Sequence, residues 1–279
     1  GQCNTKDHLQ QRRHKRRGQS YCRNYNIFTI SFFRILPWVL LWGYRNILAF
    51  NSPRNNNKAR MSSTARRMVG KLNPDKTMLL LCDMQERFRP LISKMETVIQ
   101  TSRYMTSVCS ALKVPILATQ QYTKVFGPTI PECFDETNPV AAEQGWATLA
   151  KLRDNNMVFE KKLFSMLTPE VQSVLDEKKE ELSTFVLVGI EAHVCVQQTC
   201  LDLLEQGKDV HIIVDGVSSQ QPIDRQIALQ RMQAAGAYLT TAQSAAFMLM
   251  KSADHANFKT VSKLTVAHMK LKNEFNEGM

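Results

Sequence analysis

Six short apolar runs, separated by amphipathic segments, dominate the sequence between residues 77 and 241. The runs lack a strict apolar–polar alternation, which is typical of strands buried on both faces. The predicted strands are 77–83, 114–120, 156–161, 184–190, 209–215 and 237–241, and helices are predicted over 91–112, 169–183, 194–206 and 223–235. Such alternation predicts right-handed crossovers and a parallel sheet between two helical layers. We therefore expect a doubly wound, Rossmann-like α/β fold with a six-stranded, mainly parallel sheet.

Positive charge is concentrated at the beginning of the chain. Residues 1–60 contain 12 Lys and Arg against a single acid, Asp7, whereas residues 61–279 contain 24 basic and 24 acidic residues. The net charge of +11 therefore belongs to the first sixty residues, and the remainder has no excess of charge with which to attract a polyanion. We expect no nucleic-acid partner for the α/β part of the protein.

The first sixty residues have several interpretations. A basic stretch at 10–23 precedes an apolar and aromatic run at 27–44, and the first methionine is Met61. Translation beginning at Met61 would leave this extension out of the mature protein, a targeting signal would direct it to an organelle or to export, and an apolar anchor would hold it at a membrane. Arg34 and Pro37 interrupt the run and disfavour the anchor, so a membrane partner is expected only if the run is retained.

The remaining boundaries follow from composition. We assign 61–74 to a linker, 75–255 to the α/β domain and 256–279 to a polar C-terminal tail. Seven cysteines, an odd number, show neither a CxxC motif nor zinc-ligand spacing, which indicates reduced thiols and an intracellular protein. The expected location is the cytoplasm, or the mitochondrion if residues 1–60 are a targeting segment.

Three polar side chains follow different predicted strands. Asp83 ends the first, Lys161 ends the third, and Cys195 stands in the turn after the fourth, two residues beyond His193. Each alone has a structural explanation: a helix cap, a solvated lysine and a buried thiol. Because the carboxyl ends of parallel strands meet at one edge, where ligands of open α/β sheets bind, we expect the three to converge.

A thiol, an ammonium and a carboxylate at one site make a nucleophile. Free cysteine is mostly protonated at neutral pH and becomes reactive near a helix N-terminus or a positive charge. The ammonium of Lys161 supplies that charge, and Asp83 can accept the thiol proton and return it to a leaving group. Backbone amides at the strand-to-helix corner are placed to bind an oxyanion.

Four motifs, in order, resemble the isochorismatase-like cysteine hydrolases, and most closely the isochorismatase domain-containing proteins of animals. They are LLLCDMQERF, ATQQYTKVFGPTIPE, FEKKLFSM and VGIEAHVCVQQT, and the resemblance spans roughly residues 75–255. It implies an Asp–Lys–Cys catalytic triad at Asp83, Lys161 and Cys195. Lys161 is chosen over Lys162 because it stands four residues before Ser165, as in the family's K-x-x-x-S spacing.

The resemblance also implies a cis peptide bond between Ile190 and Glu191, and an oxyanion hole formed by the amides of Glu191 and Cys195. Metal-binding relatives carry an Asp-x-His loop where this chain has Gln120, Gln121 and Tyr122, so we expect neither a metal nor another cofactor. Retention of Cys195 favours covalent cleavage of an amide or ester over vinyl-ether hydrolysis.

The sequence therefore predicts a hydrolase of a small amide, ester or imide-like substrate that works through a thioester. Pocket-lining candidates are Phe88, Gln121, Tyr122 and Phe164, although a core-packing role for the two phenylalanines is equally open. The alternative is a binding or interaction protein that keeps the fold without turnover. A dinucleotide-binding domain is disfavoured because DMQERF stands where the first strand would lead into G-x-G-x-x-G. Family members are commonly oligomeric, so we expect a homo-oligomer.

Overall fold

The computed structural model describes residues 69–136, 142–178 and 180–277. The N-terminal extension, its apolar run at 27–44 and most of the assigned linker lie outside the described residues. No helix in the described part of the chain is long and apolar enough to cross a membrane.

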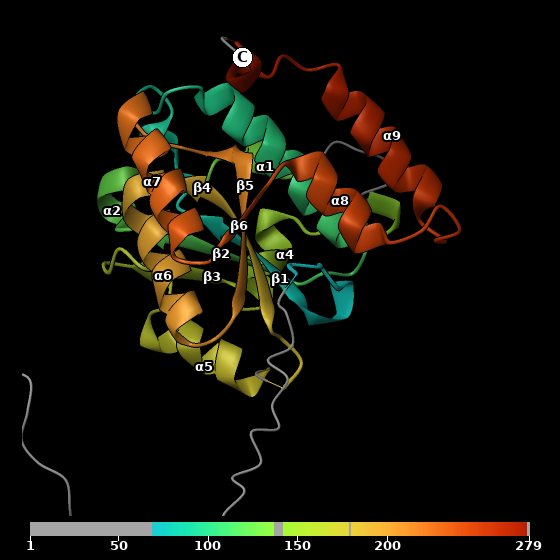
Figure 1. Cartoon of the computed structure of the whole chain (residues 1–279), viewed down its shortest axis with the longest axis horizontal. Coiled ribbons are helices and arrows are strands. Elements are labelled where there is room, and N and C mark those ends of the chain that lie inside the picture. Colours follow the sequence, from blue (N-terminus) through green and yellow to red (C-terminus); the bar gives the residue numbers. More distant parts are fainter. Residues whose placement is uncertain (1–68, 137–141, 179, 278–279) are drawn as a thin grey trace, which may run out of the picture. The chain divides into compact units, whose positions relative to one another are not determined.

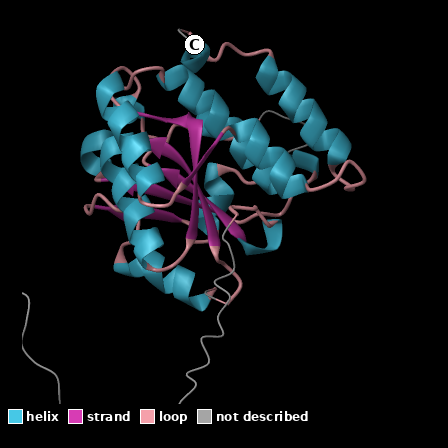
Figure 2. Cartoon of the chain, viewed as in Figure 1, coloured by secondary structure: helices cyan, strands magenta, loops and turns pink. Residues whose placement is uncertain are grey.

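A six-stranded sheet forms the centre of the domain, with helices on both sides (Figure 2). The strands are β1 (Thr77–Cys82), β2 (Ile116–Gln121), β3 (Val158–Lys161), β4 (Thr184–Ile190), β5 (Asp209–Ser218) and β6 (Tyr238–Thr240). Their order is β3-β2-β1-β4-β5-β6, and every pairing is parallel. The predicted fold class is confirmed, and the sheet is entirely rather than mainly parallel.

The helices divide into two layers (Figure 1). They are α1 (Met95–Ala111), α2 (Thr123–Phe126), α4 (Leu149–Asp154), α5 (Pro169–Glu177), α6 (Gln197–Glu205), α7 (Pro222–Ala234), α8 (Ala242–Met250) and α9 (Phe258–Met269). Helices α5, α6 and α7 pack on one face of the sheet, which we call the α6 face, and α1, α4, α8 and α9 pack on the other, the α1 face.

The strands contribute alternately to the two cores. In β1, Leu79 and Leu81 pack on the α1 face, whereas Met78, Leu80 and Cys82 pack on the α6 face, and all five are fully buried. A strand buried on both faces needs apolar residues at consecutive positions, which is why the first apolar run of the sequence shows no alternation.

Several predicted boundaries are corrected. The fifth strand continues to Ser218, past the predicted end at 215, so Asp215 lies inside β5. The register between β4 and β5 shifts between Leu187 and Gly189, and the longer strand accommodates this irregularity. The helix predicted over 169–183 ends at Glu177, where Lys178 caps it with its backbone amide.

The segment 256–279, assigned to a polar tail, contains helix α9, which packs against α1. Val261 of α9 is fully buried, and the hydroxyls of Tyr104 and Thr265 share a hydrogen bond of 2.8 Å between the two helices. The Tyr104 and His268 rings stack with centroids 4.5 Å apart. Val261 and Thr265 are the buried residues of α9, whereas Val266 and Met269 are exposed.

Gly189 allows the end of β4 to approach β1 closely. Its φ is +120°, and a Cβ there would overlap the carbonyl oxygen of Cys82. Only glycine fits this backbone conformation and this contact. The approach brings the turn after β4 against the end of β1, which is where two of the predicted catalytic residues stand.

Candidate active site

The candidate site lies at the topological switch point of the sheet. Strands β1 and β4 are neighbours, and the chain leaves them toward opposite edges, to β2 and to β5. A crevice opens at the carboxyl ends of such a strand pair. Asp83 directly follows β1, the turn that contains Cys195 follows β4, and Lys161 is the last residue of β3.

Asp83 is a buried carboxylate whose polar partners include side chains of strands β2 and β3. Its backbone has φ 49°, in the left-handed region, and the residue is 1% exposed. Oδ1 accepts a hydrogen bond of 2.7 Å from the Thr119 hydroxyl on β2, and Oδ2 lies 2.7 Å from Nζ of Lys161. Burial of a carboxylate is costly unless it is paired in this way.

Lys161 reaches across β2 to this carboxylate. Its Nζ also donates to the side-chain oxygen of Gln121 at 2.6 Å and to the carbonyls of Leu163 at 3.1 Å and Phe164 at 2.9 Å. Burial alone lowers the pKa of Lys161, but the acidic side chains of Cys82, Asp83 and Cys195 outweigh it and raise the pKa above its ordinary value. The ammonium therefore remains charged.

Cys195 lies in a five-residue π-helical turn, Ala192–Val196, that leads into α6. The sequence predicted an ordinary helix over 194–206, whereas π-helical turns are rare and concentrate at functional sites. The peptide bond between Ile190 and Glu191 is cis, which confirms the bond implied by the family resemblance. Cys195 is 7% exposed, while the other four described cysteines are fully buried.

A threonine one helical turn later connects Cys195 with the lysine loop. The Thr199 hydroxyl donates to the Cys195 carbonyl at 2.6 Å and accepts from the Met166 amide at 2.8 Å. Since the carbonyls of Leu163 and Phe164 bind Lys161 in the same loop, Thr199 links the positions of the thiol and the ammonium. Sequence reasoning missed Thr199, although its i+4 spacing from Cys195 was visible.

A second thiol, which sequence reasoning also missed, belongs to the cluster. Sγ of Cys82 lies 3.7 Å from Oδ2 of Asp83, the oxygen that pairs with Lys161. Burial raises the pKa of Cys82 well above its usual range, and the nearby Cys195 and the negative charge of Asp83 raise it further. Cys82 therefore contacts the carboxylate of the predicted triad.

Contacts on the other side of the nucleophile turn hold it against the loop before α7. The Glu191 carboxylate accepts from the backbone and side-chain amides of Gln220 at 3.0 and 3.2 Å. The Nδ1 atom of His193 lies 3.0 Å from the Ser219 hydroxyl, and Nε2 lies 3.8 Å from a carboxylate oxygen of Asp224. The ring of His193, two residues before Cys195, is therefore engaged with Ser219 and Asp224.

The four pocket-lining candidates differ in their surroundings. The amide of Gln121 is occupied at both ends, by Lys161 and by the Lys162 carbonyl at 3.0 Å. Tyr122 is 37% exposed and lies under Nζ of Lys162, which is 5.4 Å from the ring centroid. Phe88 stacks on Phe126 with centroids 4.6 Å apart and packs against the α1-face core, whereas Phe164 is 53% exposed. Their role toward a substrate stays a prediction.

The residues that replace a metal-binding loop have contacts within the protein. The side-chain amide of Gln120 donates to the Thr129 hydroxyl at 2.8 Å. Within the described ranges, no three His, Cys, Asp or Glu side chains come together as a metal site would require.

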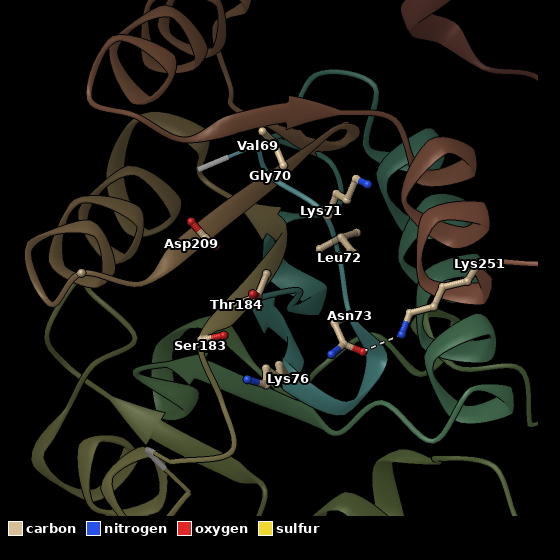
Figure 3. Close-up of a pocket in the computed structure, with 11 residues that line it drawn as sticks. Val69, Gly70, Lys71, Leu72, Asn73, Lys76, Ser183, Thr184, Asp209 and Lys251 are labelled. Atoms are coloured by element: carbon tan, nitrogen blue, oxygen red, sulfur yellow. Dashed lines mark hydrogen bonds between the residues drawn. The ribbon is translucent and has the colours of Figure 1, made fainter. Parts of the chain in front are cut away.

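A cavity of about 510 Å³ lies at the opposite end of the strands, beside the starts of β1, β4 and β5 (Figure 3). Its lysines do not converge on one point. Nζ of Lys251 is directed at Asn73 and bonds its side-chain oxygen at 2.9 Å, while Lys76 points away from that pair. This cavity is remote from the cysteine cluster, because the two lie at opposite ends of a parallel sheet.

The strand order, the switch point and the buried carboxylate–ammonium pair define a doubly wound α/β protein with a charged cluster at the carboxyl ends of its central strands. The isochorismatase domain matches residues 77–244, well over half of the chain. The chain belongs to the isochorismatase family.

Two relatives from distant eukaryotes support this assignment. Isochorismatase family protein 1A of Dictyostelium discoideum is 41% identical over 199 residues, which cover 71% of this chain and 89% of the relative. Isochorismatase domain-containing protein 2A of Mus musculus is 37% identical over 202 residues, 72% of this chain and 88% of the relative. The predicted family is confirmed.

Solved structures show the same fold. The MAR1 ribonuclease from Caenorhabditis elegans is 38% identical, with a TM-score of 0.61 over 70% of this chain and 92% of that chain. The YcaC gene product of Escherichia coli, an octameric hydrolase of unknown specificity, is 21% identical, with a TM-score of 0.57 over 74% of this chain and 96% of that chain. At this identity the second likeness concerns the fold alone.

Proposed function

We propose that the protein is a cysteine-dependent hydrolase that cleaves a small amide, ester or imide-like substrate through a thioester on Cys195. The observation that carries this proposal is the fully buried ion pair between Asp83 and Lys161, which lies beside two thiols of which one reaches the surface. Burying a charged group costs several kcal/mol even after the structure relaxes. Titratable groups in such surroundings are concentrated at functional sites.

In the proposed reaction, Asp83 receives the proton of Cys195, and the thiolate attacks the substrate carbonyl. The amides of Glu191 and Cys195 stabilise the oxyanion that forms. Asp83 then protonates the leaving group, and a thioester remains on Cys195. Asp83 next deprotonates a water molecule, which hydrolyses the thioester and restores the free thiol.

Lys161 has an electrostatic role in this scheme. Its raised pKa keeps the ammonium charged, so it favours the thiolate over the thiol and holds the carboxylate in position. The exposed rings of Phe164 and Tyr122 flank the lysine loop, which supports a role in binding the apolar part of a substrate.

The ribonuclease activity in the name of the nematode structure is not part of our proposal. RNA binding draws most of its affinity from phosphate contacts by Lys and Arg. Residues 61–279 have equal numbers of basic and acidic side chains, which argues against an extended RNA-binding face.

We also propose a homo-oligomer that works in the cytoplasm. Ile223 and Ile227 stand one helical turn apart on α7 and are 58% and 53% exposed, which supports an apolar contact between subunits. The odd number of cysteines and the lack of a CxxC motif in the sequence support an intracellular location. Light scattering after size-exclusion chromatography would measure the mass, and a strictly monomeric species would contradict the first expectation.

The proposed function is tested by trapping the thioester. The full chain is incubated with a panel of small activated esters and amides, and the adduct is located by peptide mass spectrometry. We expect a transient acyl group on Cys195 and release of product. Cys195→Ser should abolish both, whereas Cys200→Ser, which changes a fully buried thiol five residues later, should leave both unchanged.

The alternative, a binding protein without turnover, predicts a different result. Cys195 would then acquire no acyl group from any member of the panel, or would keep it indefinitely, and Asp83→Asn would not alter the rate of acylation. Acylation that slows in Asp83→Asn while the fold is retained would exclude this alternative.

A further inference from the structure

We propose that Thr199 is a positioning residue of the site, whose hydroxyl fixes the distance between the Cys195 thiol and the Lys161 ammonium. This inference deepens the proposed function and rests on it. Thr199 is fully buried in the first turn of α6, four residues after Cys195. Its hydroxyl makes two hydrogen bonds, one to the nucleophile turn and one to the loop that follows Lys161.

Lys161 acts on the thiol through its charge. Its Nζ lies within hydrogen-bond distance of four oxygens, at 2.6 to 3.1 Å, which belong to Asp83, Gln121, Leu163 and Phe164. An ammonium has three N–H bonds, so these oxygens engage all of them. Lys161 therefore stabilises a thiolate by Coulomb attraction, which depends on the distance between the two charges.

The loop after β3 holds the ammonium in place. The carbonyls of Leu163 and Phe164 accept from Nζ of Lys161, so the position of the ammonium is tied to the position of this loop. Two residues beyond Phe164, the fully buried Met166 donates its backbone N–H to the Thr199 hydroxyl at 2.8 Å. This bond anchors the end of the lysine loop on α6.

The same hydroxyl holds the nucleophile turn. Its single proton goes to the carbonyl of Cys195 at 2.6 Å. Cys195 stands in the π-helical turn, and a threonine hydroxyl that binds the carbonyl four residues earlier sets the local bend of a helix. One oxygen atom thus joins the residue that carries the thiol to the loop that carries the ammonium.

Several titratable groups surround the nucleophile turn. They are Cys82, Asp83 and Lys161 at the sheet edge, Glu191 and His193 in the turn itself, and Asp224 on α7. A substitution at Thr199 leaves all of these side chains in the chain. A changed pH profile of Cys195 would therefore report a changed position of the thiol relative to these charges.

The test is the pH dependence of Cys195 alkylation by iodoacetamide in the full chain, followed by peptide mass spectrometry. Thr199→Val keeps the shape of the side chain and removes the hydroxyl, so the turn and the loop are no longer joined. We expect the rate at pH 7 to fall by about fivefold or more and its rise to move to higher pH. Thr199→Ser keeps the hydroxyl and should restore most of the rate.

Thr265→Val is the matched control, on the other face of the sheet. The Thr265 hydroxyl also donates to the carbonyl four residues earlier, that of Val261, at 2.8 Å, and it also bonds a second segment through Tyr104. Its loss should lower the urea midpoint, as the loss of the Thr199 hydroxyl does, but should leave the pH profile of Cys195 unchanged. A purely structural role of Thr199 would make the two variants behave alike.

The outcomes separate the positioning role from the proposed function. A Thr199→Val protein with the wild-type rate and pH profile, or a Thr199→Ser protein as slow as Thr199→Val, overturns the role while leaving the hydrolase intact. A wild-type Cys195 that reacts no faster than the buried Cys200 overturns the hydrolase itself. If Thr199→Val does not fold, as judged by circular dichroism, Thr199→Ala removes the same hydroxyl without crowding and is compared with Thr199→Ser in its place.

Discussion

Two pairs of cysteines lie on opposite faces of one sheet and have opposite surroundings. Cys109 and Cys133 belong to the α1-face core, are fully buried, and have pKa values that burial raises far above the usual range. Cys82 and Cys195 also belong to a core, that of the α6 face, but they lie near the Asp83 carboxylate and the Lys161 ammonium. The comparison teaches that burial alone makes a thiol inert, whereas burial beside a paired charge creates conditions for chemistry.

The largest expected effect is the difference in reactivity between the two faces. In the native protein at pH 7, Cys195 should react with iodoacetamide at least about a hundredfold faster than Cys109 or Cys133, because their raised pKa values leave almost no thiolate. Mass spectrometry of the digested protein measures each rate. After denaturation the three should react alike, and equal rates in the native state would remove the basis of the comparison.

A second prediction concerns the charge pair that distinguishes the α6 face. Lys161→Met leaves the buried Asp83 carboxylate without its cation, so the free energy of unfolding should fall by about 3–5 kcal/mol. Urea denaturation measures it. Lys162→Met, at the adjacent residue that lies over Tyr122, is the matched control and should change stability by about 0.5 kcal/mol or less.

The double variant Asp83→Asn/Lys161→Met tests whether the two charges of this pair are energetically coupled. Because it removes both charges, it should regain part of the stability lost in Lys161→Met. A double variant as unstable as the sum of the two single changes would mean that the pair is not energetically coupled.

The α1 face has a buried ionisable group of its own, without a paired charge. His211 is 1% exposed, both of its ring nitrogens lack a hydrogen-bond partner among the described residues, and burial lowers its pKa to about 4. The unfolded chain takes up this proton near pH 6.5, before the folded protein does. Stability should therefore fall as the pH drops from about 6.5 to about 4, by up to about 3 kcal/mol.

Replacing the histidine isolates this contribution. His211→Phe, which can still stack on Tyr238, should flatten the pH dependence of the urea midpoint in that range. His255→Gln serves as the control, since His255 is partly exposed. A His211→Phe protein with the same acid sensitivity as the wild type would show that other groups govern it.

The smallest expected effect tests whether the α1 face only supports the fold. Tyr104→Phe removes the hydroxyl that joins α1 to Thr265 of α9 and keeps the ring that stacks on His268. We expect a loss of about 1 kcal/mol in urea denaturation. The alkylation rate of Cys195 should not change, and a change would indicate that α9 influences the site from the opposite face.

The fold could be predicted from the sequence because the apolar pattern of each strand and helix is set by neighbouring residues along the chain. Consecutive apolar residues such as those of 77–83 are suited to strands buried on both faces, and the amphipathic segments between them leave few alternatives to a doubly wound sheet. The C-terminal segment was assigned to a polar tail because only its tertiary contacts with α1, such as the Tyr104–Thr265 hydrogen bond, show that helix α9 belongs to the domain.

The candidate site was predicted in part. Asp83, Lys161 and Cys195 could be chosen because each follows a strand, and parallel strands bring their carboxyl ends together. Their roles in a reaction stay predictions. Cys82 and Thr119 were not chosen, because a thiol or hydroxyl inside a strand has the same local pattern whether it packs in the core or binds a carboxylate.

The sequence by itself determined which residues become strands, which edge of the sheet gathers the polar side chains, and which family the chain belongs to. Only the tertiary structure decided that Lys161 reaches across β2 to Asp83, that Cys195 stands in a π-helical turn, and that the Cys82 thiol contacts the Asp83 carboxylate. Strand identity depends on neighbours along the chain. The contacts of a side chain depend on register, on backbone approaches such as the one at Gly189, and on the burial of charge, which arise between segments distant in sequence.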